Sequence, residues 1–286
     1  MVLAVAACAC PVLATAATPQ AQYVALGDSY SSGEGNGPFD GPCHRARQAD
    51  SAYPRMLPGM IGYLAMPTFQ ACTSATIVDV WKRPQPNRRG QGIQIQHVSA
   101  STDLVTLTIG GNDLGFSSIV KRCLLPGNCS DGDFSKRIEA GLGTIQAELA
   151  DVYRRIRERM DPDGYLVVGG YPHLFTSASK ADCKRFISSG EAAWINSLVD
   201  RGNTRIAAAV RATRQASGNV AYVAVDERFS GHELCTEDQW LYGIKLVLGD
   251  GLIKGSYHPT KSGQRAYAEA FAAFLRRPAI RGALTE

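Results

Sequence analysis

Short apolar runs alternate with stretches of helical periodicity over most of this chain. The runs are rich in β-branched and aromatic residues and stop at glycine, aspartate or other small residues, as buried strands do. They lie at 23–26, 68–72, 104–109, 165–169 and 220–225. Helical spacing of apolar residues is found at 134–160, 191–215 and 261–277, and a shorter helix begins near Ser51. Strands alternating with helices form parallel βαβ units. The pattern therefore predicts an α/β sandwich with a central parallel sheet, in which ligands bind at the carboxyl ends of the strands.

The first 21 residues differ in composition from the rest of the chain. An apolar run opens at Val2–Ala7, and Ala14–Ala16 has the small residues of a signal cleavage site, although no Lys or Arg precedes the run. The run is too short and too rich in Ala and Thr to span a bilayer permanently. Val5–Cys8 also resembles a lipoprotein cleavage box, but it lacks a preceding positive charge. We expect a secretory leader over 1–21, a single domain over 22–286, and a secreted, extracellular mature protein.

The chain is mildly basic, with a formal net charge of +4 and 20% charged residues. That is well short of the basic footprint of a nucleic-acid-binding domain. The most basic run, Lys82–Arg89, is interrupted by prolines and contains no aromatic residue, so it predicts a solvated loop. The glycine-rich segment Ser31–Gly37 lacks the lysine of a phosphate-binding loop. We expect a small-molecule or lipid partner, no nucleic acid, no cofactor, and a monomer that contacts lipid interfaces transiently.

Cysteine usage indicates disulfides. The chain has eight cysteines, and Cys8 and Cys10 belong to the leader. An even number in an exported chain favours three bridges, although six cysteines allow fifteen pairings. Cys123 and Cys129 flank a Pro-Gly turn that can bring their sulfur atoms together. The other four pair most simply as sequence neighbours, Cys43 with Cys72 and Cys183 with Cys235. No CxxC or closely spaced Cys/His set points to zinc, so no metal site is expected.

Groups suited to acyl transfer follow three of the predicted strands, and a fourth precedes the last helix. Ser29 follows the first strand; a serine nucleophile needs a base for its proton and donors for the oxygen that becomes negative. His258 can be that base, because imidazole titrates near neutrality. Asn112 can donate a side-chain N–H to the oxyanion, and Thr73–Ser74 forms the turn after the strand predicted at 68–72. The alternative is that Ser29 only caps a turn.

These motifs occur in the order of a known family. Gly27–Ser31, Gly110–Asp113 and His258–Pro259 resemble blocks I, III and V of the GDSL/SGNH hydrolases, spread over nearly the whole mature chain. The longer Gly-Asp-Ser-Tyr-Ser-Ser-Gly-Glu-Gly run, Gly231–Cys235 and the six-cysteine pattern are similar to secreted Streptomyces-type lipases and esterases. The resemblance implies a flavodoxin-like, three-layer α/β/α fold, ester hydrolysis without a metal, and the neighbour-to-neighbour disulfides.

The resemblance also implies roles for individual residues. Ser29 is the expected nucleophile and His258 the base, and the N–H of Ser29 and the side chain of Asn112 are the expected oxyanion donors. Ser74 stands where similar sequences have glycine. It retains the backbone N–H that the oxyanion needs, but glycine and serine differ in the backbone angles they favour.

A second departure concerns the group that orients the base. Many members of the family have an aspartate three residues before the histidine, and here that position is Gly255. A main-chain carbonyl can take over the orienting task, so the Gly255 carbonyl is the expected partner of the His258 imidazole. Asp226, at the end of a predicted strand, is the alternative.

The remaining histidines and one apolar stretch complete the predictions. Three histidines lack a surrounding motif and predict surface or packed side chains: His44, His97 and His173. His232 lies in a Gly-His-Glu turn, which predicts loop architecture. Leu114, Phe116 and the stretch 240–248 are candidates for an acyl pocket, with core packing as the alternative.

We therefore predict a secreted serine ester hydrolase, a lipase or esterase that cleaves carboxylic esters of lipids or acyl groups through an acyl-enzyme on Ser29. Phospholipase or polysaccharide deacetylase activity on the same scaffold is the nearest alternative. An inactive lipid- or glycan-binding protein is the alternative from another class. In that case the departures from the family at Ser74 and Gly255 would be the changes that abolished catalysis. A nucleophile-directed phosphonate separates these classes, because only a catalyst is modified at Ser29.

Overall fold

The structure is a computed structural model that describes residues 20–85, 90–123, 127–176, 187–243, 246–247, 251–252 and 255–286. Parts of several predictions lie outside the described residues: most of the leader (1–19), the end of the basic run (86–89), Pro126 of the Pro-Gly turn, Cys183, and 244, 245 and 248 of the apolar stretch. Within the described ranges, no helix has the length and apolar character needed to cross a membrane.

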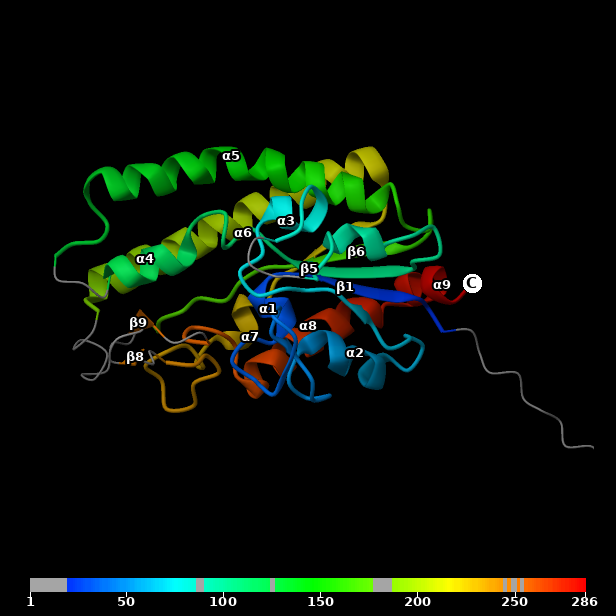
Figure 1. Cartoon of the computed structure of the whole chain (residues 1–286), viewed down its shortest axis with the longest axis horizontal. Helices are drawn as coiled ribbons and strands as arrows, with labels where there is room; N and C mark the ends of the chain where they lie inside the picture. Colours follow the sequence, from blue (N-terminus) through cyan, green and yellow to red (C-terminus); the bar gives the residue numbers. More distant parts are fainter. Residues whose placement is uncertain are drawn as a thin grey trace, which may run out of the picture.

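A parallel sheet of five strands forms the middle of the molecule (Figure 1). The strands are β1 (Tyr23–Gly27), β4 (Thr68–Phe69), β5 (Leu104–Thr108), β6 (Tyr165–Gly169) and β7 (Val220–Val223). Their spatial order is β4-β1-β5-β6-β7, which in chain order is the 2-1-3-4-5 order of flavodoxin-like folds. Every neighbouring pair is parallel. The predicted strands and the parallel sheet are confirmed.

The strands are apolar because helices cover both faces of the sheet. All five residues of β1 are buried, and their side chains alternate between two packed clusters. Val24 and Leu26 pack on one face, and Tyr23 and Ala25 on the other. The polar Thr106 inside β5 is satisfied by the hydroxyl of Tyr23 at 2.7 Å. The sheet is therefore a rigid platform for the loops at its carboxyl edge.

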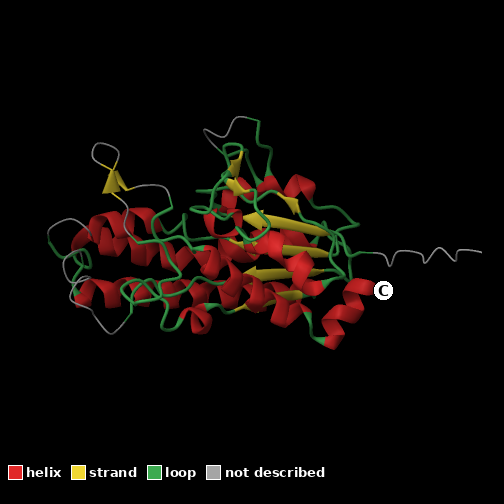
Figure 2. Cartoon of the chain, turned by 90° about the horizontal axis from the view of Figure 1, so that it is seen from below, coloured by secondary structure: helices red, strands yellow, loops and turns green. Residues whose placement is uncertain are grey.

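Helices form the outer two layers (Figures 1 and 2). One face is covered by α3 (Ile77–Trp81), α5 (Gly132–Arg157) and α6 (Ser189–Ser217). The other carries α1 (Ser29–Ser32), α2 (Tyr53–Ile61), α7 (Asp226–Phe229) and α8 (Lys261–Leu275), after which comes α9 (Pro278–Thr285). Smaller elements are η1 (Gln94–His97) and the hairpins β2–β3 (Phe39–Asp40, Arg45–Ala46) and β8–β9 (Leu246–Val247, Gly251–Leu252). The predicted long helices are confirmed with ends shifted by up to three residues, whereas the shorter helices α1, α3, α7 and α9 were not predicted.

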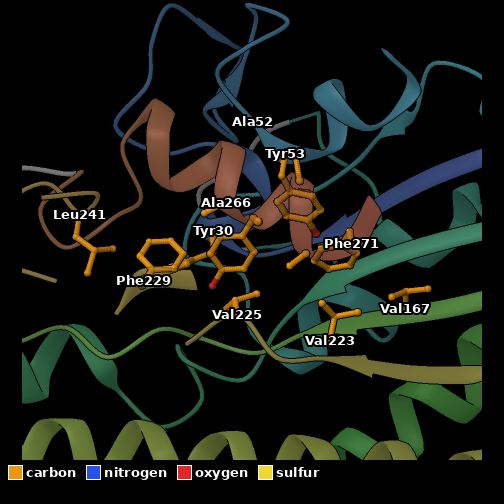
Figure 3. Close-up of a cluster of buried hydrophobic side chains, with 14 of the residues drawn as sticks. Tyr30, Ala52, Tyr53, Val167, Val223, Val225, Phe229, Leu241, Ala266 and Phe271 are labelled. Carbon is orange, nitrogen blue, oxygen red and sulfur yellow. The ribbon is translucent and has the colours of Figure 1, made fainter. Parts of the chain in front are cut away.

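Aromatic side chains fill the space between the sheet and α8 (Figure 3). Tyr53 of α2 stacks on Phe271 of α8 with ring centroids 4.7 Å apart, and both side chains are fully buried. Burial of such a ring stabilises the fold by about 1.5–3 kcal/mol. A Cβ at Gly169, the end of β6, would lie 3.0 Å from the Phe271 ring, so the missing side chain makes room for it. This packing fixes the start of α8, and with it the preceding loop, against the sheet.

The two longest helices reach past the sheet. With 26 and 29 residues, α5 and α6 are about 39 and 44 Å long, whereas a five-residue strand spans about 17 Å. Their N-terminal halves project beyond the carboxyl ends of the strands, beside α4 (Phe116–Cys123) (Figures 1 and 2). We call α4 and these two half-helices the helical arm.

Two of the three predicted disulfides are confirmed. Cys43 is bonded to Cys72, and Cys123 to Cys129, with Cα atoms 4.3 and 4.9 Å apart. Cys235 also takes part in a disulfide. Its predicted partner Cys183 lies outside the described residues, so that pairing stays a prediction.

Candidate active site

Ser29 is the first residue of α1, directly after β1. Gly27 ends the strand with φ +125°, and a Cβ there would lie 2.5 Å from the carbonyl oxygen of Thr108. Only glycine lets the chain turn this close to β5. Asp28 caps the short helix, because its Oδ1 accepts the N–H of Tyr30 at 3.0 Å. The turn holds Ser29 at the carboxyl edge of the sheet, where it is 7% exposed.

Asp28 is a buried carboxylate behind this serine. Its Oδ1 also accepts the Thr108 hydroxyl at 2.8 Å, and its Oδ2 accepts the Tyr171 hydroxyl. Burial raises the pKa of Asp28 to about 6, and the hydrogen bonds from Tyr171 and Thr108 oppose the rise. The Tyr171 hydroxyl in turn accepts the N–H of Gly111 at 3.3 Å. One tyrosine therefore connects the serine turn to the Gly110–Asp113 turn, a link that the sequence motifs did not reveal.

His258 lies in the loop before α8, and a main-chain carbonyl orients its ring. Nδ1 is 2.9 Å from the carbonyl oxygen of Ser256. The predicted Gly255 carbonyl accepts the main-chain N–H of His258 at 3.2 Å, and together with the Ser256 carbonyl it acts to raise the pKa of the imidazole. A hydrogen on Nδ1 leaves the lone pair on Nε2. Burial lowers the pKa of His258 below its ordinary value, and the charge of Glu34 and the bond to Ser256 oppose this.

The backbone explains why no aspartate stands at position 255. Gly255 has φ +102°, and a Cβ there would lie 3.1 Å from the Cα of Gly35. Any side chain would be strained in this conformation and crowded by the facing loop. Asp226 does not serve either: it begins α7 and is not among the residues that line the cavity around His258.

The turns expected to hold the oxyanion lie side by side. Asn112 donates a side-chain N–H to the Ala75 carbonyl at 2.9 Å, and the carboxylate of Asp113 accepts the N–H of Ile77 at 3.1 Å. Among the described residues, only one of the two amide hydrogens of Asn112 has a partner, so the other can be donated. Ser74 has φ +64°, the left-handed conformation that glycine favours. The local backbone is thus the one that the family glycine would adopt, at a cost of about 1 kcal/mol for serine.

One cavity of about 380 Å³ brings the predicted residues together. Its polar end is lined by Ser29, Ser74, Asn112, Gly255 and His258. Its other walls come largely from apolar side chains of the helical arm and nearby loops, among them Leu114, Phe116, Leu142, Leu198 and Ile206. In the part of the chain that the structure describes, no group of three or more His, Cys, Asp or Glu side chains could hold a metal ion.

The predicted pocket is half right. Leu114 and Phe116 line the cavity, but the described residues Trp240–Gly243 do not. Trp240 stacks on His232 at 3.6 Å, and the Nδ1 of His232 binds the Asp238 carbonyl at 2.9 Å, which confirms loop architecture for this histidine. The apolar residues near position 240 therefore shape the loop before α8. Residues 244, 245 and 248 lie outside the described residues.

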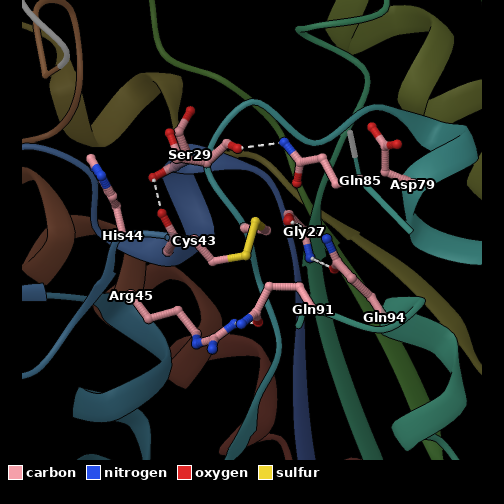
Figure 4. The surroundings of a disulfide bond; sticks show 12 residues. Gly27, Ser29, Cys43, His44, Arg45, Asp79, Gln85, Gln91 and Gln94 are labelled. Carbon is pink, nitrogen blue, oxygen red and sulfur yellow. Dashed lines mark hydrogen bonds between the residues drawn. A yellow bond between two sulfur atoms is a disulfide. The ribbon is translucent and has the colours of Figure 1, made fainter. Parts of the chain in front are cut away.

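Glu34 was missed by the sequence motifs. It follows the serine helix, is 2% exposed and lines the same cavity as Ser29 and His258. Its carboxylate pairs with Nδ1 of His44 at 3.0 Å. His44, predicted as a surface or packed residue, is next to the Cys43–Cys72 bridge, close to Ser29 (Figure 4). Glu34 stands between Gly33 and Gly35, so the sequence predicts a turn residue. A charged residue in a turn is normally expected to be exposed, and the sequence alone therefore does not predict that Glu34 is buried.

Comparisons with known proteins agree in family and fold. The chain matches the GDSL-like Lipase/Acylhydrolase family over residues 25–266. It is 34% identical to a lipase of Streptomyces rimosus over 248 residues, 85% of this chain and 82% of that protein. Its fold is similar to that of a phospholipase A1 from Streptomyces albidoflavus NA297, with a TM-score of 0.74 and 33% identity, covering 89% of this chain and 99% of the other. An extracellular lipase from Streptomyces rimosus gives a TM-score of 0.72 and 32% identity, covering 88% and 99%.

Proposed function

Because this chain belongs to the GDSL-like lipase/acylhydrolase family and is a carboxylic ester hydrolase, we propose that Ser29 is its nucleophile and His258 its general base. One observation carries the proposal: the two side chains, far apart in sequence, line a single cavity. The carbonyl that holds Nδ1 of His258 supports the assignment, since it leaves Nε2 free to accept a proton.

In the proposed reaction the Ser29 hydroxyl attacks the ester carbonyl carbon while Nε2 of His258 takes its proton. The main-chain N–H groups of Ser29 and Ser74 and the side-chain amide of Asn112 stabilise the oxyanion. His258 then protonates the departing alcohol, which leaves an acyl-enzyme on Ser29. Finally, His258 activates a water molecule that hydrolyses this ester and restores the serine.

The substrate side of the proposal is an ester with a medium or long acyl chain. The cavity walls between the catalytic groups and the helical arm are apolar, and each buried methylene contributes about 0.8 kcal/mol to binding. Sugar hydroxyls would find few partners on such walls, which disfavours a polysaccharide deacetylase. A phospholipid is the second candidate: the similar structure from Streptomyces albidoflavus is a phospholipase A1, and Lys121, at the same cavity, could meet a phosphate.

We also propose that residues 1–21 are removed as a secretory leader and that the domain 22–286 acts outside the cell as a monomer that touches lipid interfaces. The disulfides support an oxidising compartment. The similar lipase from Streptomyces rimosus is extracellular.

The test is a rate series on p-nitrophenyl esters from acetate to palmitate, with Ser29→Ala as the blank. We expect the highest kcat/KM for medium or long chains, and a loss of at least about 10³-fold in the variant. A phosphonate probe should modify the wild type at Ser29 and leave Ser29→Ala unmodified. Full activity of Ser29→Ala would refute the assignment of Ser29 as the nucleophile. A wild-type protein that is inactive and is not labelled by the phosphonate would refute the proposal that the protein is a serine hydrolase.

A further inference from the structure

A triad carboxylate does two things for its histidine: it fixes the ring and it stabilises the positive charge of the imidazolium. In this chain the Ser256 carbonyl fixes the ring, as the 2.9 Å contact with Nδ1 shows. A carbonyl dipole stabilises an imidazolium less than a full negative charge does. The second task therefore calls for a carboxylate elsewhere in the cavity, because Gly255 has no room for one.

Glu34 is a buried carboxylate in the same cavity as His258. It is 2% exposed and lines the cavity together with Ser29 and His258. Its main-chain N–H donates to the Ser29 carbonyl at 3.1 Å, which fixes it to the serine helix. A charge in such an enclosed place acts over a longer distance than one in water, because the surroundings screen it less.

The segment that carries Glu34 is joined to the loop that carries His258. Gly35 packs on Gly255, with backbone approaches that leave no space for a Cβ on Gly255. Asn36 donates its side-chain N–H to the Pro259 carbonyl at 2.8 Å and accepts the Tyr242 hydroxyl at 3.0 Å. Glu34 and His258 are therefore held in a fixed relation by the residues on either side of them.

A histidine holds the Glu34 carboxylate in place. Of the residues described, only His44 forms an ion pair or side-chain hydrogen bond with the Glu34 carboxylate. The His44 ring is stacked on Phe39 at 4.8 Å and follows Cys43, so the donor is itself held in place. The contact with Nδ1 of His44 therefore fixes the position of the Glu34 carboxylate.

The other groups around His258 do not compete for this role. Tyr30 lies 5.4 Å from the imidazole ring and donates its hydroxyl to the Tyr257 carbonyl. Burial raises the pKa of both tyrosines, so they stay neutral at the pH of catalysis. Tyr242 contacts the loop through its backbone, and the buried Asp28 is engaged by its own donors behind Ser29.

We propose that Glu34, held by His44, is a positioning residue that stabilises the protonated His258 and so replaces the charge of the absent triad aspartate. The inference rests on the proposed role of His258 as the base. The charge of Glu34 favours the imidazolium, so removing it should make the imidazolium harder to form, both in the free enzyme and in the transition state.

The test is Glu34→Gln, which keeps the shape of the side chain and removes its charge. We expect kcat to fall on the order of tenfold with little change in KM. The acidic limb of the kcat/KM profile should move to lower pH, because His258 then loses its proton more readily. Glu34→Asp, which restores the charge, should return the limb toward its wild-type position. Glu269→Gln removes a surface carboxylate of α8 and should change neither quantity.

A titration of the histidine Cε1–H signals by NMR gives a readout independent of turnover. The chain has five histidines, and His258→Ala identifies the relevant signal. A lower pKa of His258 in folded Glu34→Gln supports the proposal. An unchanged pKa of His258 refutes the proposal. A lower kcat with an unshifted acidic limb of the kcat/KM profile also refutes it, because that result indicates a purely structural role for Glu34. Failure of the serine mechanism would show separately, as activity retained by Ser29→Ala.

Discussion

At the scale of single residues, Tyr171 shows how one hydroxyl connects two parts of the site. It donates to the Asp28 carboxylate and accepts from the N–H of Gly111. Its own main chain is held by Asn203 of α6, whose side chain binds both the N–H and the carbonyl of Tyr171 at 2.9 and 2.8 Å. Helix α6 thereby fixes a donor that acts at the ends of β1 and β5.

We predict that Tyr171→Phe destabilises the protein in a pH-dependent way. Asp28 is ionised above its pKa of about 6, and a hydrogen bond to a charged group is worth about 1.5–3 kcal/mol. Below that pKa the carboxyl group is neutral, and the lost bond is worth about 0.5–1.5 kcal/mol. Since Asp28 has a raised pKa in the folded state, removing a donor to its charged form costs most above pH 6. Urea unfolding at pH 5 and pH 8 measures the difference.

Tyr267→Phe is the matched control for this variant. The Tyr267 side chain is fully buried, and its hydroxyl donates to the neutral carbonyl of Gly170 at 2.8 Å. Its loss should lower the free energy of unfolding by a similar amount at both pH values. An equal loss at pH 5 and pH 8 for Tyr171→Phe would contradict the assigned role of Asp28.

Sequence motifs predicted Ser29, Asn112 and His258 as site residues, and all three line one cavity. The motifs could not identify Ser256 as the partner of the imidazole, because the choice between adjacent carbonyls depends on backbone angles. Those angles, such as φ +102° at Gly255, follow from packing against Gly35, more than two hundred positions away in the chain. The burial of Glu34 could not be predicted for the same reason. Whether a turn residue is buried depends on which distant segments pack against it.

At the scale of elements, Gly202 is an unusual choice within α6. It is buried, lines the cavity and lies inside a 29-residue helix, where glycine costs about 1 kcal/mol relative to alanine. A Cβ at this position would lie 3.8 Å from Leu114, an ordinary contact. Packing therefore does not require a glycine here, and a larger side chain at this position would occupy part of the cavity.

We predict that Gly202→Leu shifts the acyl preference to shorter chains. The added side chain displaces two or three methylenes of a long substrate, each worth about 0.8 kcal/mol, so kcat/KM for palmitate should fall about tenfold or more relative to butyrate. Gly143→Leu in α5 is the control: nothing lies within 4 Å of an added Cβ, and the helix gains the same propensity. If Gly202→Leu changed kcat/KM for the palmitate and butyrate esters by the same factor, the acyl chain would not bind beside position 202.

Helices and strands could be predicted from the sequence where the same face, or both faces, of the element are buried along its whole length. The strands are enclosed on both faces and read as continuous apolar runs, and α5 and α6 show a clear apolar stripe. Helix α7 has one turn, and α9 follows α8 after a two-residue break at a proline, so neither has a pattern long enough to be separated from its neighbours. The residues at 240–243 were assigned to the pocket from their apolar character alone, which does not distinguish a loop core from a channel wall.

At the scale of the whole molecule, the Cys43–Cys72 bridge joins two loops that serve the site. One loop continues into His44 and the other into Thr73–Ser74, and the Thr73 N–H also donates to the Cys43 carbonyl at 3.0 Å. The bridge spans 29 positions, whereas Cys123–Cys129 spans six and lies between α4 and α5. The two disulfides should therefore differ both in stabilisation and in their effect on catalysis.

We predict that the double variant Cys43→Ala/Cys72→Ala loses about 3–4 kcal/mol of unfolding free energy, and Cys123→Ala/Cys129→Ala about 2 kcal/mol, from the entropy of closing loops of these lengths. The first variant should also lose kcat/KM when fully folded, because the Thr73–Ser74 turn, which we propose helps to hold the oxyanion, is no longer tied to the His44 loop. Urea unfolding and rates at low temperature measure both. Full activity of the folded first variant would show that hydrogen bonds alone hold the turn.

The helical arm places the walls of the channel on segments that the sheet does not constrain. The proposed catalytic groups follow β1 and β5 or lie in the loop before α8, whereas much of the cavity lining belongs to half-helices that reach past those strands. Side chains on the arm can consequently be exchanged in combination while the chemical machinery keeps its alignment. The acyl-chain selectivity could therefore be engineered with a library of substitutions confined to α5 and α6. The sheet and the loops that carry the proposed catalytic residues would stay unchanged in such a library.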